Sequence, residues 1–122
     1  MKKTAFILVV LFVITIGTSA FAARYDEVLT ITASLSFSGN TAISGGAVTP
    51  QKNGVHSSVT VRLQRWTGSG WSTLGTWYGN GSTLIGASAS GSMTIDSGTY
   101  RTWVTGTCGG ETAQKYSSER VY

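Results

Sequence analysis

The chain has 122 residues, with 9 Lys and Arg against 5 Asp and Glu, and only one His, one Cys and one Pro. This length suits a single domain. The scarcity of His, Cys and acidic residues leaves few side chains for acid–base chemistry or metal binding. We therefore expect a protein that is not an enzyme and that carries no cofactor and no metal.

The first segment has the features of an export signal. Lys2 and Lys3 precede a largely apolar run over residues 6–16, and Ala20-Phe21-Ala22 supplies small residues at a cleavage site. The apolar run is shorter than the roughly 20 residues of a membrane-spanning helix, which would be needed for the alternative, an N-terminal anchor. We predict a signal peptide over residues 1–22, cleaved after Ala22, and a secreted domain over residues 23–122 with no membrane insertion of the mature chain.

The composition of the predicted mature chain favours strands. Its 100 residues include 15 Gly, 15 Ser and 15 Thr, which disfavours helices. Loss of Lys2 and Lys3 lowers the net charge from +4 to +2, and the remaining basic residues are dispersed, so we expect no nucleic-acid partner. A lone cysteine, Cys108, allows no disulfide within the chain and leaves open only a bond to another chain.

The first half of the domain predicts two strands and a loop. Residues 29–37 alternate between apolar and hydroxyl side chains, a pattern typical of a half-buried strand. Its predicted inward side chains are Leu29, Ile31, Ala33, Leu35 and Phe37. A weaker strand over 41–48 follows, with a bulge expected at Gly45-Gly46, and residues 50–54 form a loop.

The second half predicts a series of hairpins. A strand over 59–66 and a strand over 71–78 flank the turn 67–70, and residues 83–95 hold one or two weak strands. A final hairpin joins 100–108 to 112–122 through a turn at 109–111. Seven or eight short strands in 100 residues predict an all-β fold, an antiparallel sandwich without a disulfide.

One motif refines this prediction. Asp96-Ser97-Gly98-Thr99-Tyr100 has the pattern D-x-G-x-Y, which resembles the corner of immunoglobulin-like domains where a tyrosine hydroxyl bonds back to nearby backbone. The resemblance assigns this structural role to Asp96, Gly98 and Tyr100. Antibody domains carry a disulfide cysteine two positions after the tyrosine, where this chain has Thr102, so the likeness is to the immunoglobulin-like sandwich and not to antibody domains.

Two longer segments carry a broader likeness. Residues 59–77 (VTVRLQRWTGSGWSTLGTW) and 97–118 (SGTYRTWVTGTCGGETAQKYSS) resemble small secreted immunoglobulin-like or fibronectin-like proteins of Gram-positive bacteria, most of which have no assigned function. The resemblance implies a bacterial, extracellular β-sandwich and no particular activity.

The hairpin register decides where the tryptophans lie. A four-residue loop over 67–70 pairs Trp66 with Trp71. If the register then continues without a bulge, Leu63 lies opposite Leu74 and Thr60 lies opposite Trp77, and the two residues of each pair point to the same face. Val61, Leu63 and Leu74 then point inward. The outward side chains form a predicted ligand-binding face of Trp66, Trp71, Trp77, Trp103, Arg62 and Arg101.

Two other registers bear on this face. A one-residue bulge at Gly68 or Gly70 would instead bury Trp71 and Trp77 in the core. In the last hairpin, a two-residue turn would point Lys115 inward, so we favour a three-residue turn with a bulge, which sends Lys115 outward and Tyr116 inward.

Few residues suit catalysis. His56 stands near a loop without a nearby acid, Ser or Cys in sequence, and Cys108 ends an inward-phased strand. The five acids, Asp26, Glu27, Asp96, Glu111 and Glu119, form no facing pair in any register that we can justify. An enzyme would require His56, Cys108 and an acid to converge in a cleft.

These observations favour a secreted binding module. An exposed face of tryptophan and arginine predicts recognition of a glycan or of a protein on a cell envelope. One alternative is a structural, self-associating surface protein, since a Ser- and Thr-rich sandwich has edge strands that can pair. Another is a secreted antimicrobial-type protein, although no amphipathic helix is predicted.

Overall fold

The computed structural model describes residues 26–122, so the predicted signal peptide and its cleavage site lie outside the described residues. Within them the chain forms strands and no helix. The strands are β1 (Val28–Ser38), β2 (Thr41–Pro50), β3 (Ser57–Trp66), β4 (Trp71–Gly81), β5 (Ala87–Thr94), β6 (Thr99–Cys108), β7 (Glu111–Tyr116) and β8 (Arg120–Val121).

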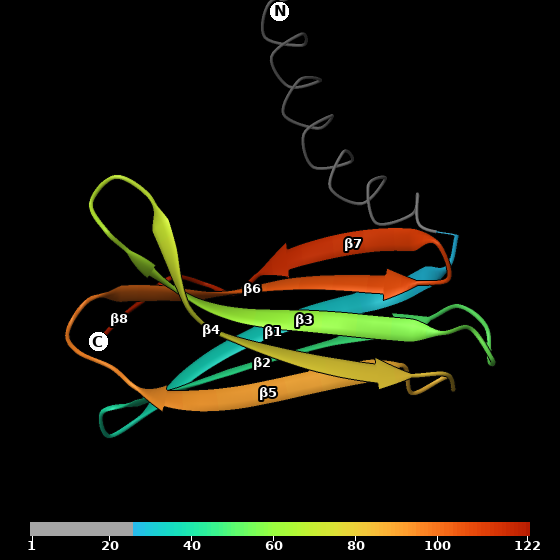
Figure 1. Cartoon of the computed structure of the whole chain (residues 1–122), viewed down its shortest axis with the longest axis horizontal. Coiled ribbons are helices and arrows are strands. Elements are labelled where there is room, and N and C mark those ends of the chain that lie inside the picture. Colours follow the sequence, from blue (N-terminus) through green and yellow to red (C-terminus); the bar gives the residue numbers. More distant parts are fainter. Residues whose placement is uncertain (1–25) are drawn as a thin grey trace, which may run out of the picture.

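The eight strands form two antiparallel sheets that face each other (Figure 1). One sheet has the order β1-β2-β5, and the other has the order β4-β3-β6-β7 with β8 beside β6. We call them the three-stranded and the five-stranded sheet. The predictions of an all-β fold, of antiparallel strands and of seven or eight strands are confirmed, and the residues described contain no disulfide because Cys108 is a free cysteine.

The two sheets meet in a core of small and β-branched side chains. Val48 of β2 and Val104 of β6 have no exposed surface. A Cβ on Gly46 would lie 2.5 Å from a methyl carbon of Val104, and a Cβ on Gly106 would lie 2.7 Å from the Cβ of Val48. These glycines let the sheets approach closely. The expected bulge at Gly45-Gly46 is wrong, because the pairing of β2 is continuous on both sides there.

A bulge does occur at the start of β1. Val28 lies opposite Pro50 and Thr30 opposite Thr49, so Leu29 is the additional residue. Val28 therefore enters the core, and Leu29, predicted inward, is 58% exposed. The later inward residues, from Ile31 to Phe37, face the core as predicted.

The β3–β4 hairpin contains the bulge that matters most for the tryptophans. Trp66 pairs with Trp71 as predicted, and Gln64 pairs with Thr73. Leu63 then lies opposite Gly75, which leaves Leu74 without a partner. After Leu74, the positions of β4 that were predicted to point outward point inward, and the reverse. The predicted inward position of Leu74 is wrong, and its side chain is exposed.

Trp77 consequently points into the core. It lies opposite Val61, whose side chain is fully buried. It packs against two clusters of buried side chains in the core, one that includes Val104 and one that includes Tyr100. Two glycines make room for the indole: a Cβ on Gly91 would overlap its fused ring atoms, and a Cβ on Gly75 would lie 2.8 Å from Cη2. The prediction of an outward Trp77 is therefore wrong, and so is its predicted pairing with Thr60.

The D-x-G-x-Y corner has the expected hydrogen bond. The Tyr100 hydroxyl donates to the backbone carbonyl of Asp96 over 2.6 Å, and Tyr100 is almost fully buried. A Cβ on Gly98 would lie 2.7 Å from Nε of Arg65, so the glycine leaves space for the guanidinium. Backbone hydrogen bonds between Gly98 and Tyr122 tie the end of the chain to this corner.

The last hairpin closes with a two-residue turn, which corrects the predicted three-residue turn. Cys108 pairs with Glu111, and Gly109 has a φ of 62° that suits the first position of such a turn. Lys115 thus shares the inner face with Val104, and Tyr116 shares the outer face with Trp103. An inner-face lysine is tolerated because β7 is an edge strand and its side chain reaches solvent.

Glu111 fastens the start of β1 to β7. Its carboxylate accepts hydrogen bonds from the backbone N–H groups of Asp26, Glu27 and Val28, each over 3.0 Å. Desolvation raises the pKa of this carboxyl, but the three N–H donors outweigh it and hold the pKa below its ordinary value.

The described residues include no helix of the length and hydrophobicity that crossing a membrane requires.

Substituting Gly91 tests the inward position of Trp77. We expect Gly91→Ala to lower the free energy of unfolding by about 1–3 kcal/mol, because the new methyl group overlaps the indole and must displace it. Thermal and denaturant unfolding measure the change. Gly110→Ala is the matched control, since a Cβ there meets no atom within 4 Å; equal stability of the two variants would contradict the placement of Trp77.

Candidate functional site

The outer face of the five-stranded sheet holds most of the predicted binding residues. Arg62 and Trp66 come from β3, Trp71 from β4, and Arg101 and Trp103 from β6. Alternation along antiparallel strands puts these five side chains on one face. Trp77 is separated from them, because the bulge at Leu74 turns it inward.

The outer-face side chains stack in one continuous row. The Trp66 and Trp71 rings meet edge to face, with centroids 5.3 Å apart. The Arg101 guanidinium lies between the rings of Trp71 and Tyr116, 4.2 Å and 4.1 Å from their centroids. We call the whole row the aromatic–arginine ladder, and its members in order are Trp66, Trp71, Arg101, Tyr116, Trp103 and Arg62.

The far end of the ladder is also stacked. Tyr116 lies nearly parallel to Trp103, with an interplanar angle of 14° and centroids 6.0 Å apart. The Arg62 guanidinium covers the Trp103 ring at 4.3 Å. Cation–π contacts of this kind contribute about 0.5–1 kcal/mol each at exposed sites, so the row is held in place without a ligand.

Hydrogen bonds from the sheet fix the orientation of the ladder. Arg101 Nε donates to Gln64 Oε1 over 2.8 Å, and Gln64 in turn donates to the Thr73 hydroxyl over 3.2 Å. Arg62 donates to the Thr105 hydroxyl over 3.1 Å. The nearly buried Gln64 amide is therefore satisfied by both neighbouring strands.

Tyr116 is a ladder residue that sequence reasoning assigned to the core. The signal that would have placed it is the Gly109-Gly110 pair, since a two-residue turn sets Tyr116 opposite Trp103. Tyr78 was missed as well. It pairs with Thr60 on the same outer face and is 73% exposed, so it extends the aromatic surface beyond the ladder.

The electrostatics of the outer face are one-sided. Arg62 and Arg101 are the charged side chains that β3, β4, β6 and β7 present on this face. The one acid of β7, Glu111, lies on the other face of the sheet, where its carboxylate accepts hydrogen bonds from the backbone N–H groups of residues 26–28. The two guanidinium groups therefore lie on this face without an acidic neighbour from these strands.

The residues weighed for catalysis lie apart from the ladder. Cys108 is fully buried with its sulfur 3.3 Å from the Ser57 hydroxyl, whereas His56 is exposed in the preceding loop. Over residues 26–122, no three His, Cys, Asp or Glu side chains are grouped so that they could hold a metal ion.

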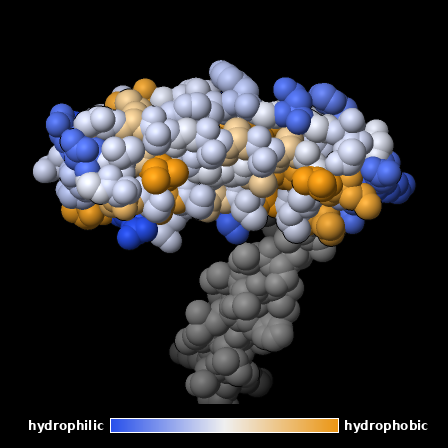
Figure 2. Space-filling view, turned by 90° about the horizontal axis from the view of Figure 1, so that it is seen from below, coloured by the Kyte–Doolittle hydropathy of each residue, from blue (hydrophilic) through white to orange (hydrophobic). Residues whose placement is uncertain are grey.

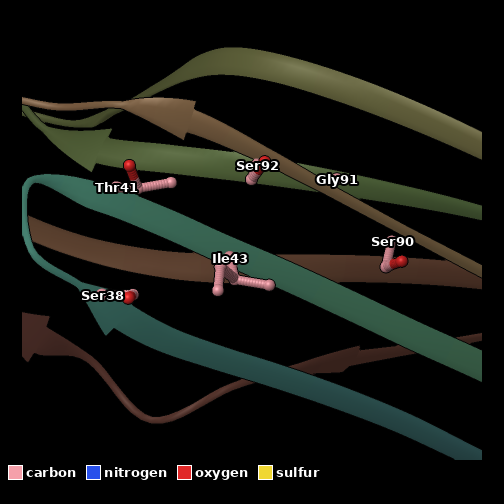
Figure 3. A pocket seen from close by; sticks show the side chains of 6 residues that line it. All are labelled: Ser38, Thr41, Ile43, Ser90, Gly91 and Ser92. Carbon is pink, nitrogen blue, oxygen red and sulfur yellow. The ribbon is translucent and has the colours of Figure 1, made fainter.

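The opposite face of the molecule is different in character. Figure 3 shows a shallow depression over the three-stranded sheet, lined by Ser38, Thr41, Ile43, Ser90, Gly91 and Ser92. This depression offers hydroxyl groups and one aliphatic side chain, and none of its lining residues is charged. Figure 2 shows apolar atoms as separate spots on the side that it displays, so apolar area alone does not mark a site there.

Comparisons with protein-family models, with curated proteins and with solved structures found no match to this chain.

A double-mutant cycle tests whether the ladder is formed in solution. We expect Arg101→Gln and Trp71→Ala each to destabilise the fold, with a coupling of about 0.5–1 kcal/mol between them, because each substitution removes the same stacking contact. Denaturant unfolding of the two single variants and the double variant measures the coupling. Strictly additive effects would contradict the stacking of Arg101 on Trp71.

Proposed function

We propose that this protein is a secreted, non-enzymatic binding module that recognises a glycan or a protein on a cell envelope. The recognition surface is the outer face of the five-stranded sheet. The observation that carries the proposal is the aromatic–arginine ladder, in which Arg101 lies between two aromatic rings and Arg62 covers a third.

The ladder suits recognition because its side chains are already ordered. Binding through flexible side chains costs conformational entropy for each one immobilised, and the stacking contacts remove much of that cost beforehand. Trp66 and Tyr116 nevertheless remain 43% and 42% exposed. Aromatic rings and arginine are also the residues that contribute most strongly to binding at protein interfaces.

The proposed architecture is an immunoglobulin-like sandwich. Two features support it: the Tyr100 hydroxyl bond to Asp96, and the neighbouring positions of β3 and β6 in a sheet that faces β1, β2 and β5. Such domains commonly serve binding functions, but the fold itself does not specify a ligand. The proposed bacterial, extracellular location rests on the sequence features of residues 1–22 and on the resemblance of 59–77 and 97–118.

Self-association through sheet edges is the alternative, and three of the four edge strands carry features that oppose it, whereas β5 pairs continuously with β2 and carries no charge. Bulges interrupt β1 at Leu29 and β4 at Leu74, and β7 carries Lys115 on its inner side. Bulges and inward-phased lysines on edge strands hinder pairing with another chain. We therefore favour recognition through a face over assembly through an edge.

Co-sedimentation with bacterial cell walls and insoluble polysaccharides tests the proposal. We expect the mature domain to pellet with at least one of these materials. A Trp66→Ala, Trp103→Ala double variant should lose most of this binding, because both substitutions remove ring surface from the ladder.

The matched control is a Leu29→Ala, Ile43→Ala double variant, which removes two exposed apolar side chains from the three-stranded sheet. It should pellet as the unchanged domain does, and circular dichroism should show that both double variants are folded. Binding that survives in the tryptophan variant, or that is lost equally in the control, argues against the outer face as the recognition surface.

A further inference from the structure

We infer that the ligand of the outer face is an anionic polymer of sugars or polyols, whose carboxylate or phosphate groups bind Arg62 and Arg101 while its carbon-bound hydrogens lie against the aromatic side chains. This inference rests on the proposed function and names the ligand class for the same surface. The shared chemistry is a carboxylate or phosphate group repeated along a chain of sugars or polyols.

The outer face of the five-stranded sheet is positively charged. The strands β3, β4, β6 and β7 present two cations and no acid on their outer face. Each guanidinium has five N–H donors, and the hydrogen bonds that fix Arg101 to Gln64 and Arg62 to Thr105 use one donor of each. Donors remain on both groups for a ligand, and the surface complements a negative one.

The placement of the Arg101 guanidinium suits an anionic ligand. A planar guanidinium binds a carboxylate or phosphate through two parallel N–H donors. The two ring contacts of Arg101 and the hydrogen bond from its Nε to Gln64 hold the guanidinium in place, and its two terminal nitrogens keep donors for a ligand. A lysine in this place would keep the charge but could not maintain the stacked, two-donor arrangement.

The shape of the surface favours a polymer over a folded protein. Strong protein interfaces place anchor side chains in well-packed pockets. A depression that borders the ladder at Trp66 is lined by Arg65, Trp66, Thr67, Ser72 and Leu74, and neither ladder arginine contributes to it. The arginines instead lie at separate rungs with Tyr116 and Trp103 between them, an arrangement that an extended, repeating ligand can follow.

Paired probes test the inference. Polygalacturonate carries repeated carboxylates, and its fully methyl-esterified form has the same sugar backbone without them; poly(glycerol phosphate) supplies the phosphate version. Isothermal titration of the mature domain should show binding to at least one anionic probe, weakened by salt, and at least about tenfold weaker binding of the ester than of the acid where polygalacturonate is bound.

Matched variants locate the binding. Arg101→Gln and Arg62→Gln should each weaken binding of the anionic probe by about tenfold, since each removes charge-assisted hydrogen bonds. Lys52→Gln removes the same charge from an exposed turn outside the sheets and should leave binding unchanged. Arg101→Lys should bind more weakly than the unchanged domain even though its charge is retained.

The outcomes separate the inference from the proposed function. Equal affinity for the ester and the acid, or equal losses in Lys52→Gln and Arg101→Gln, overturns the acidic-ligand inference while the outer face can still be the recognition surface. Binding only to a wall protein also overturns it. Failure to bind cell walls and every probe overturns the proposed function as well.

Discussion

The one-residue bulge at Leu74 determines which tryptophans enter the core and which lie on the outer face. It divides a hairpin that would otherwise present Trp66, Trp71 and Trp77 on one surface. Trp66 and Trp71 lie before the bulge and stay outside, whereas Trp77 follows it and completes the core beside Val61. The indole reaches both buried clusters, so the same bulge provides the largest side chain between the sheets and leaves a narrower aromatic surface outside.

The outer surface gains order from the core beneath it. Val61, Leu63 and Val104 are fully buried, so β3 and β6 are held in a fixed register. Their outward neighbours are then set at fixed positions across the sheet, where stacking costs little additional entropy. Arg101 lies between rings from β4 and β7, although both of these strands are at the edges of the sheet. The ladder thus connects all four main strands through side chains as well as through backbone hydrogen bonds.

Much of the fold could be predicted from periodicity and turn residues. The alternation along 29–37 and 59–66 identified strands, and the D-x-G-x-Y pattern identified the Tyr100 corner. Bulge positions could not be predicted, because they depend on packing between sheets: Leu74 is displaced where Gly75 and Gly91 make space for Trp77. The turn of the last hairpin was predicted wrongly because Lys115 was expected to avoid the inner face. On an edge strand, an inner-face lysine costs little because its side chain still reaches solvent. Five of the six predicted site residues lie together on the outer face. Tyr116 was missed because placing Lys115 outward placed its neighbour Tyr116 inward.

Side-chain NMR spectroscopy tests whether the outer face of the five-stranded sheet binds an anionic polymer of sugars or polyols. The four tryptophans give four indole N–H signals, one of which, from Trp77, reports on the core. During titration with polygalacturonate or poly(glycerol phosphate), we expect shifts in the indole signals of Trp66, Trp71 and Trp103 and in the Nε–H signals of Arg62 and Arg101, with little change at Trp77. Shifts confined to the Trp77 indole signal or to backbone amide signals of the three-stranded sheet, or no shifts with any anionic probe, would mean that the outer face is not the binding surface.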